Sequence, residues 1–176
     1  LLRLNCPAVR VGHPAATRES LRNHTLDAWA LRLGGDDYVR ARPDERDALR
    51  RRALLGADVV VATCVGAGSD ALAPWLGLAP RPGQEDVLDF GLVLVDEAAQ
   101  ATELAALVPL AAAPHATQLV LVGDPCQLPP MVLSRDAGEL RTSLFQRLVA
   151  TGLRPALLTT QYRMHPALNR FSSERL

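Results

Sequence analysis

Short runs of mainly aliphatic residues recur along the chain, separated by stretches richer in polar residues. Each run is about four residues long, which is too short for a helix and typical of a buried strand in a parallel sheet. We therefore expect a strand at each of these positions. The predicted strands are Ala8–Val11, Val59–Ala62, Leu92–Val95, Leu119–Val122 and Ala156–Thr159.

The segments between these runs contain helix signals. Pro43 is followed by acidic residues and the stretch ends in arginines, which suits the dipole of a helix. Pro109 is expected to end or kink the helix before it, and Gly152 stands where a helix cap is expected. The predicted helices are Thr17–Arg22, Pro43–Leu55, Thr102–Leu107, Ser143–Ala150 and Pro166–Arg175, and the predicted loops are 33–42 and 74–89.

The alternation of strands and helices predicts an α/β fold with a mainly parallel sheet flanked by helices. A domain boundary is expected near Thr151–Pro155, so that residues 1–152 form one domain and residues 153–176 begin a second. The chain begins with leucine and ends inside a helical pattern. We therefore expect a segment of a longer protein, incomplete at both ends.

The composition is that of a globular protein. The 176 residues are 48% hydrophobic and carry no net charge, and every cation is an arginine because the chain has no lysine. Three cysteines far apart predict neither a disulfide framework nor a metal site, and they favour a reducing compartment. The chain has no signal peptide and no apolar stretch long enough to span a membrane, so we expect no membrane partner.

Two carboxylates, Asp96 and Glu97, follow directly on the run Leu92–Val95. Open α/β sheets bind ligands at the carboxyl ends of their strands. One carboxylate can hold Mg²⁺, directly or through water, and the other can orient or deprotonate an attacking water. Taken alone, the pair favours another interpretation, a solvated strand end that starts a helix, where acidic residues suit the dipole.

The next run, Leu119–Val122, ends in Gly123 and Asp124, and Gln127 follows within the same turn. The ends of neighbouring parallel strands lie at the same edge of a sheet, so Gln127 is expected near the two carboxylates. An amide that both donates and accepts hydrogen bonds suits the sensing of a γ-phosphate or a water. The alternative is that Gly123 to Pro125 form a simple turn.

Arg163 follows the fifth aliphatic run and would belong to the second domain. A cation that reaches a γ-phosphate across a cleft acts as an arginine finger. The alternative is a surface arginine at a helix start. Tyr162 can stack on a base or pack in a core, and His165 is expected at the entry of a helix.

Together these motifs resemble superfamily 1 helicases of the 5′→3′ branch, in the group named for the up-frameshift RNA helicase and including the immunoglobulin-mu-binding helicase. Asp96 to Glu103 is similar to helicase motif II, Gly123 to Pro130 to motif III, and Ser143 to Pro166 to the stretch through motif IV. Ala57 to Gly68 resembles the segment of the first domain that contacts nucleic acid.

The resemblance implies a RecA-like P-loop NTPase fold that binds ATP and Mg²⁺. By that resemblance, Asp96 coordinates Mg²⁺ and Glu97 is the catalytic base, while Gln127 and Arg163 contact the γ-phosphate and Tyr162 borders the adenine. Gly123 and Asp124 would also belong to the ATP site. Thr63, Cys64, Val65 and Gly66 would lie along the nucleic-acid backbone.

The function implied by the resemblance is ATP-driven 5′→3′ movement on single-stranded RNA or DNA, by a monomer inside the cell, in the cytoplasm or nucleus. The lysine of a phosphate-binding loop must lie outside this chain, so we expect the chain alone to bind ATP poorly. The alternative is an inactive helicase-like scaffold that binds nucleic acid or proteins. A metabolic nucleotide-binding enzyme would need a third glycine after Gly66-Ala67-Gly68.

Overall fold

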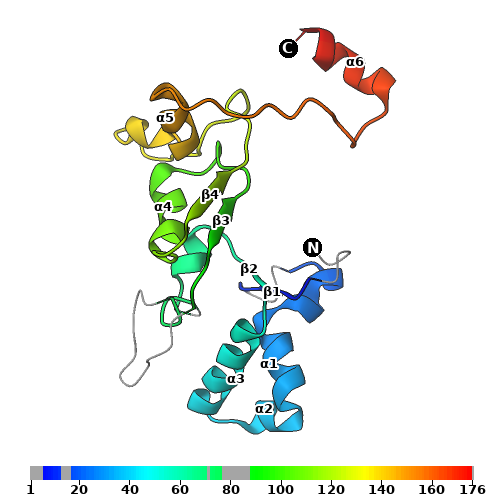
Figure 1. The fold of residues 1–176 in the computed structure, drawn as a ribbon, viewed down its shortest axis with the longest axis vertical. Helices are drawn as coiled ribbons and strands as arrows, with labels where there is room; N and C mark the ends of the chain where they lie inside the picture. Colours follow the sequence, from blue (N-terminus) through cyan, green and yellow to red (C-terminus); the bar gives the residue numbers. More distant parts are fainter. Residues whose placement is uncertain (1–5, 13–16, 71, 77–87, 176) are drawn as a thin grey trace.

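The computed structural model describes residues 6–12, 17–70, 72–76 and 88–175, and the side chains only as far as residue 170. Strands and helices alternate along this part of the chain (Figure 1). The strands are β1 (Ala8–Arg10), β2 (Val59–Val61), β3 (Leu92–Val95) and β4 (Gln118–Leu121). The α-helices are α1 (Leu26–Gly34), α2 (Asp36–Arg40), α3 (Pro43–Leu55), α4 (Glu103–Ala111), α5 (Leu144–Ala150) and α6 (Pro166–Arg175), and the 3₁₀ helices are η3 (Glu19–His24), η4 (Val65–Gly68) and η5 (Gly138–Arg141).

The strands form two small parallel sheets, each with helices packed against it. In the first, Ala8 pairs with Val59; in the second, Leu92 pairs with Gln118 and Val95 with Leu121. This confirms the predicted α/β class and the parallel direction of the strands. The four strands do not join into one sheet among the described residues. None of the described helices is long and apolar enough to cross a membrane.

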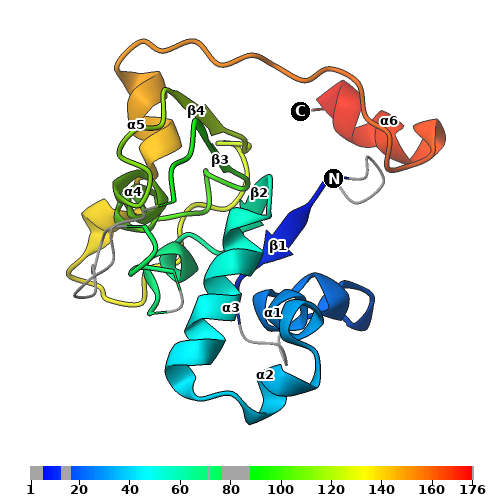
Figure 2. The ribbon, with the colours of Figure 1, turned by 60° about the horizontal axis from the view of Figure 1, so that its bottom comes forward.

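Helices α1 and α3 pack against each other and against the first sheet, with α2 between them in sequence (Figure 2). The apolar core here includes Val9 and Leu54, which are at most 1% exposed, together with Leu26 and Trp75. Thr25 caps α1 by accepting a hydrogen bond from the backbone N–H of Ala28. This cap and the buried apolar face of α1 fix the position of the helix. Its last residues fall within the stretch 33–42, which was predicted to be a loop.

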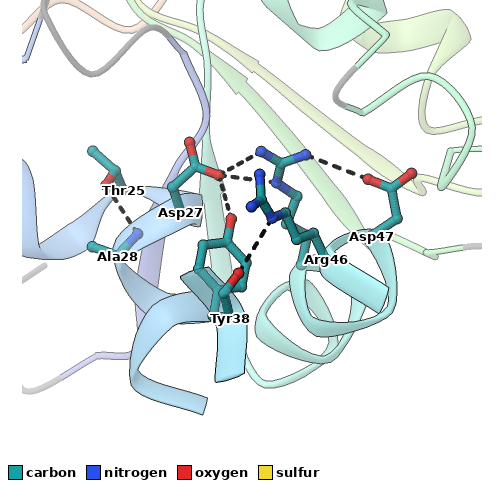
Figure 3. A network of polar contacts seen from close by, with 7 residues as sticks. Thr25, Asp27, Ala28, Tyr38, Arg46 and Asp47 are labelled. Carbon is teal, nitrogen blue, oxygen red and sulfur yellow. Dashed lines mark hydrogen bonds and ion pairs between the residues drawn. The ribbon is translucent and has the colours of Figure 1, made fainter. Parts of the chain in front are cut away.

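Asp27 of α1 is the centre of a polar network that joins the three helices (Figure 3). Its Oδ1 accepts hydrogen bonds from the Tyr38 hydroxyl of α2 and from Nε of Arg50 of α3, each at 2.9 Å. Arg46 lies over the ring of Tyr38, 5.9 Å from its centroid, and donates to the carbonyl oxygens of Tyr38 and Val39. Burial and the bond to Asp27 raise the pKa of Tyr38.

The second sheet buries one face and leaves the other open. Val93 and Val95 of β3 pack with Ala98, Ala113 and Phe145, the last from α5. Leu92 and Leu94, which alternate with them, are 47% and 58% exposed. Parallel strands are normally buried on both faces, and β3 and β4 have the apolar sequence that such burial requires. Described residues cover only one of their two faces.

Two predicted helices, Pro43–Leu55 and Pro166–Arg175, are confirmed with the same bounds. The helix predicted for 143–150 is α5, with Ser143 as its N-cap. The predicted cap at Gly152 is confirmed as a Schellman motif: Gly152 has φ 100°, its N–H donates to the Val149 oxygen, and that of Leu153 to the Leu148 oxygen.

Four local predictions were wrong. The loop predicted for 33–42 contains the end of α1 and all of α2, because the Asp27 network ties α2 to its neighbours. The helix predicted for 17–22 is a 3₁₀ helix at 19–24. The helix predicted for 102–107 is α4, which runs past Pro109 to Ala111. The fourth error concerns the fifth strand.

The strand predicted at Ala156–Thr159 does not form. Residues 152–162 have neither helix nor strand, and Leu157 and Leu158 are each 85% exposed. A strand needs a neighbour to receive its backbone hydrogen bonds, and no described strand lies beside this segment. The loop predicted for 74–89 lies largely outside the described residues; Pro74–Leu76 and 88–89 have no helix or strand.

Candidate active site

The two carboxylates lie at the carboxyl end of β3, and both are exposed. The backbone turns sharply here: Glu97 has φ 52°, a left-handed conformation uncommon for residues other than glycine. The Glu97 N–H donates to Oδ1 of Asp96 at 3.0 Å, and Nε2 of Gln100 donates to Oε2 of Glu97 at 3.0 Å. Each carboxylate is thus held by one local donor, and both side chains remain exposed.

The ends of β3 and β4 are joined by backbone hydrogen bonds beyond the strands themselves. The N–H of Val122 donates to the oxygen of Val95 at 2.9 Å, and that of Ala98 to the oxygen of Val122 at 2.8 Å. The segment with the carboxylates and the segment beginning at Gly123 therefore lie side by side. This confirms that the two strand ends meet at one edge of the sheet.

Gly123 permits a close approach between these two segments. A Cβ atom at this position would lie 2.8 Å from the Ala99 nitrogen and 3.1 Å from the Ala98 nitrogen. The shorter distance is one that real Cβ atoms essentially never show, and both neighbours are backbone atoms that cannot swing away. Only glycine lets the Gly123 backbone lie directly on the turn that carries Glu97.

Asp124 organises the loop that contains Gln127. Its Oδ1 accepts from the Cys126 N–H at 2.9 Å, and its Oδ2 accepts from Nε2 of Gln127 at 3.1 Å. The Gln127 N–H also donates to the Asp124 carbonyl oxygen at 3.2 Å. This turn leaves both side chains exposed at the same edge of the sheet.

Gln161 builds the turn that presents Tyr162 and Arg163. Its Oε1 accepts from the N–H groups of Arg163 and Met164, at 3.0 and 2.9 Å, and its Nε2 donates to the Met164 oxygen at 2.6 Å. Tyr162 is 93% exposed and Arg163 is also exposed. His165 accepts from the Ala167 N–H through Nδ1, which confirms it as a helix-entry residue.

The structure does not bring Tyr162 and Arg163 to the carboxylates. Residues 152–165 lead away from β3 and β4 towards α6 (Figure 1). No hydrogen bond or ion pair joins Arg163 to Asp96, Glu97 or Gln127 in the described part of the chain. The described site therefore has two parts, one at the edge of the sheet and one in the turn before α6.

The segment predicted to contact nucleic acid follows β2 and is a compact turn. Oγ1 of Thr63 accepts from the Gly66 N–H at 3.0 Å, and the Thr63 carbonyl oxygen accepts from that of Ala67. Val65 is 68% exposed, while Cys64 is half-buried against the core of the second sheet, where burial raises the pKa of its thiol. The turn packs against α4, the helix that follows the carboxylates.

Sequence reasoning missed one ion pair close to this site. Arg147 of α5 contacts Glu103, the first residue of α4, with Nε 2.9 and 2.8 Å from the two carboxylate oxygens. These hydrogen bonds lower the pKa of Glu103 and raise that of Arg147. The partners are 44 residues apart, so no local pattern could have predicted the contact.

The oxygen atoms at the strand end fit a magnesium ion bound mostly by water and phosphate. Mg²⁺ prefers oxygen ligands and often binds through only one or two carboxylates, and Asp96 is an exposed carboxylate held by one local donor. No group of three or more His, Cys, Asp or Glu side chains that could hold a metal occurs among the described residues. A metal ion bound here would therefore take its remaining ligands from water and from the phosphate groups of a substrate.

Comparison with known proteins identifies the family to which the chain belongs. Two family descriptions, both of an AAA domain, match residues 30–135 and 140–176. The chain is 42% identical over 143 residues to a regulator of nonsense transcripts 1 homolog of Drosophila melanogaster, covering 80% of this chain and 11% of the relative.

Two further relatives agree. The ATP-dependent helicase upf1 of Schizosaccharomyces pombe is 39% identical over 128 residues, covering 72% of this chain and 12% of the relative. The DNA-binding protein SMUBP-2 of Mesocricetus auratus is 35% identical over 208 residues, covering 96% of this chain and 20% of the relative. The chain thus spans between about a tenth and a fifth of the length of these relatives.

The chain belongs to the superfamily 1 helicases of the up-frameshift and SMUBP-2 type, in the part covered by two successive AAA-domain matches. This confirms the resemblance seen in the motifs. The relatives include ATP-dependent helicases, and the AAA domain implies ATP binding.

Adding one methyl group at Gly123 tests the close contact between the two segments. We expect Gly123→Ala to lower the free energy of unfolding by about 1–3 kcal/mol, because the added Cβ must push the Ala98–Ala99 backbone away. Gly138→Ala is the matched control, since no atom lies within 4 Å of its Cβ position. Urea unfolding measures both, and equal values for the two variants would contradict the contact.

The lowered pKa of Glu103 gives a pH prediction. A carboxyl whose pKa is lower when folded contributes stability above its unfolded pKa of about 4.3, and loses it as the pH falls through the folded value. We expect the NMR titration midpoint of the Glu103 carboxyl to lie below the ordinary range and to rise in Arg147→Gln. Arg22→Gln, which removes an exposed arginine of η3, is the control and should leave the Glu103 midpoint unchanged.

Proposed function

We propose that the parent protein hydrolyses ATP at the edge of the second sheet and uses the cycle to move 5′→3′ along single-stranded RNA or DNA. The observation that carries this proposal is the pair of segments after β3 and β4, held together by the hydrogen bond from Ala98 to Val122. They bring two carboxylates and the Gln127 loop to one edge, where α/β sheets bind ligands.

Asp96 and Glu97 take different roles in this proposal. The Asp96 carboxylate would hold Mg²⁺, and the ion would neutralise charge on the phosphates. Glu97 accepts the proton of the attacking water through an oxygen of its carboxylate, and the Gln100 amide orients that carboxylate. The left-handed backbone at Glu97 aims this side chain away from the direction that a continued strand would give it.

Gly123, Asp124 and Gln127 form the neighbouring wall of the proposed ATP site. Asp124 holds the loop through three local hydrogen bonds, so the Gln127 amide is presented in a fixed place. We assign Gln127 to the γ-phosphate or its attacking water, because an amide can donate to the first and accept from the second.

Arg163 and Tyr162 belong to a second domain in this proposal, beginning at residue 153. The Schellman cap at Gly152 ends the first domain, and the exposed segment after it carries the Gln161 turn. Closure of the two domains brings the Arg163 guanidinium to the γ-phosphate and Tyr162 to the adenine. The same closing and opening displaces Thr63, Cys64, Val65 and Gly66 along the nucleic-acid backbone.

Whether the parent protein acts on RNA or on DNA is decided by experiment on the full-length protein. The names of the relatives refer to nonsense transcripts in one case and to DNA binding in another. Binding of single strands without sequence reading rests on backbone contacts, which both polymers offer. Strand displacement on matched RNA and DNA duplexes with 5′ or 3′ overhangs gives both the substrate and the direction.

Replacing the proposed base tests the assignment of Glu97. We expect Glu97→Gln in the full-length parent to bind ATP normally and to hydrolyse it about 10²- to 10⁴-fold more slowly, because the amide cannot accept the proton. Steady-state turnover and a nucleotide-binding titration measure the two effects. Glu139→Gln, a substitution at an exposed site, is the control and should behave as wild type. Near-normal turnover by Glu97→Gln would contradict the assignment of Glu97 as the base.

The arginine turn provides an independent test. We expect Arg163→Ala in the parent to lower turnover roughly 10³- to 10⁵-fold, the range for arginine fingers, with little change in nucleotide affinity. Arg154→Ala removes another exposed arginine from the same segment and is the matched control. If both variants lose activity equally, Arg163 has no special role in the reaction.

A further inference from the structure

The ion pair between Glu103 and Arg147 joins two helices that are distant in sequence. Arg147 donates through Nε and one terminal nitrogen, at 2.5–2.9 Å from the Glu103 carboxylate. Such a two-pronged contact fixes direction as well as distance. The pair therefore defines where the first turn of α4 lies relative to α5.

Glu103 lies at the end of the segment that begins with the proposed catalytic carboxylates. The near end, at Ala98, is held by the hydrogen bond to Val122. At the far end, Thr102 caps α4 by accepting from the Ala105 N–H, and Glu103 then meets Arg147. Residues 96–101 form no helix or strand, so the position of Glu97 depends on how both ends are held.

α5 offers a firm support for this segment. Ser143, which is fully buried, caps the helix reciprocally with Gln146. Phe145 packs in the same core as Val95 and Ala98, on either side of the carboxylates in sequence. α5 thus supports the carboxylate segment at two points, an apolar one through Phe145 and an ionic one through Arg147.

We propose that Glu103 and Arg147 are positioning residues for ATP hydrolysis: their ion pair holds the start of α4 against α5 and so keeps Glu97 in its working place. The inference rests on the proposed function of Glu97. Neither side chain touches the reacting atoms. Because both are partly exposed, the pair contributes little to stability, as exposed ion pairs generally do.

The test uses three variants of the full-length parent: Glu103→Gln, Arg147→Gln and the two combined. We expect each single change to lower kcat for ATP roughly 10- to 100-fold through misplacement of the base, with KM and Tm nearly unchanged. The double variant should lose no more than the worse single one, because the two residues act as a unit. Glu19→Gln and Arg22→Gln, from exposed sites on η3, are the controls.

Three results would overturn the inference. These are an unchanged kcat in both single variants, losses that multiply in the double variant, or a fall in kcat that simply follows a fall in Tm. Glu97→Gln is run in parallel. If it loses turnover while the pair variants do not, only the inference fails; if the wild-type parent hydrolyses no ATP, the proposed function fails and the inference with it.

Discussion

The hydrogen bond from the Ala98 N–H to the Val122 oxygen is the contact on which the rest of the site depends. It extends the parallel ladder of β3 and β4 beyond the strands and into the loops. Without it, the two aliphatic runs would still pair, but the residues after them could diverge. Gly123 completes this arrangement, because its backbone lies against Ala98 and Ala99 at a distance that no side chain allows. The proposed chemistry depends on backbone contacts that are independent of the carboxylates themselves.

The sequence was informative where short-range rules decide the outcome. Proline, acidic residues and arginines marked α3 to the residue, and Gly152 marked the end of α5. The shared edge at the ends of β3 and β4 followed from the strand pattern, since parallel neighbours end on the same side. Predicting these features requires only residues that are close in sequence, or one general rule of sheet topology.

The errors came from contacts between distant residues. The segment at 33–42 is rich in glycine and aspartate, which favour loops, yet Tyr38 binds Asp27 and the short helix forms. Ala156–Thr159 has the composition of a strand but no partner beside it among the described residues. The ion pair between Glu103 and Arg147 could not be predicted for the same reason, because the two residues lie on separate helices. Roles of single residues, such as Gln127 and Arg163, came from the family resemblance and not from the pattern.

The exposed segment between Gly152 and Arg163 has a consequence for how the arginine is supplied. Residues 153–162 form a tether of ten residues without helix or strand, and a flexible chain of that length has a root-mean-square span of roughly 16–19 Å. A group carried on such a short tether is present at its target at an effective concentration on the order of millimolar. In the proposed mechanism, the Arg163 guanidinium is therefore supplied by the same chain and does not have to be recruited from another molecule. Lengthening the tether would dilute the group without altering any atom of the site.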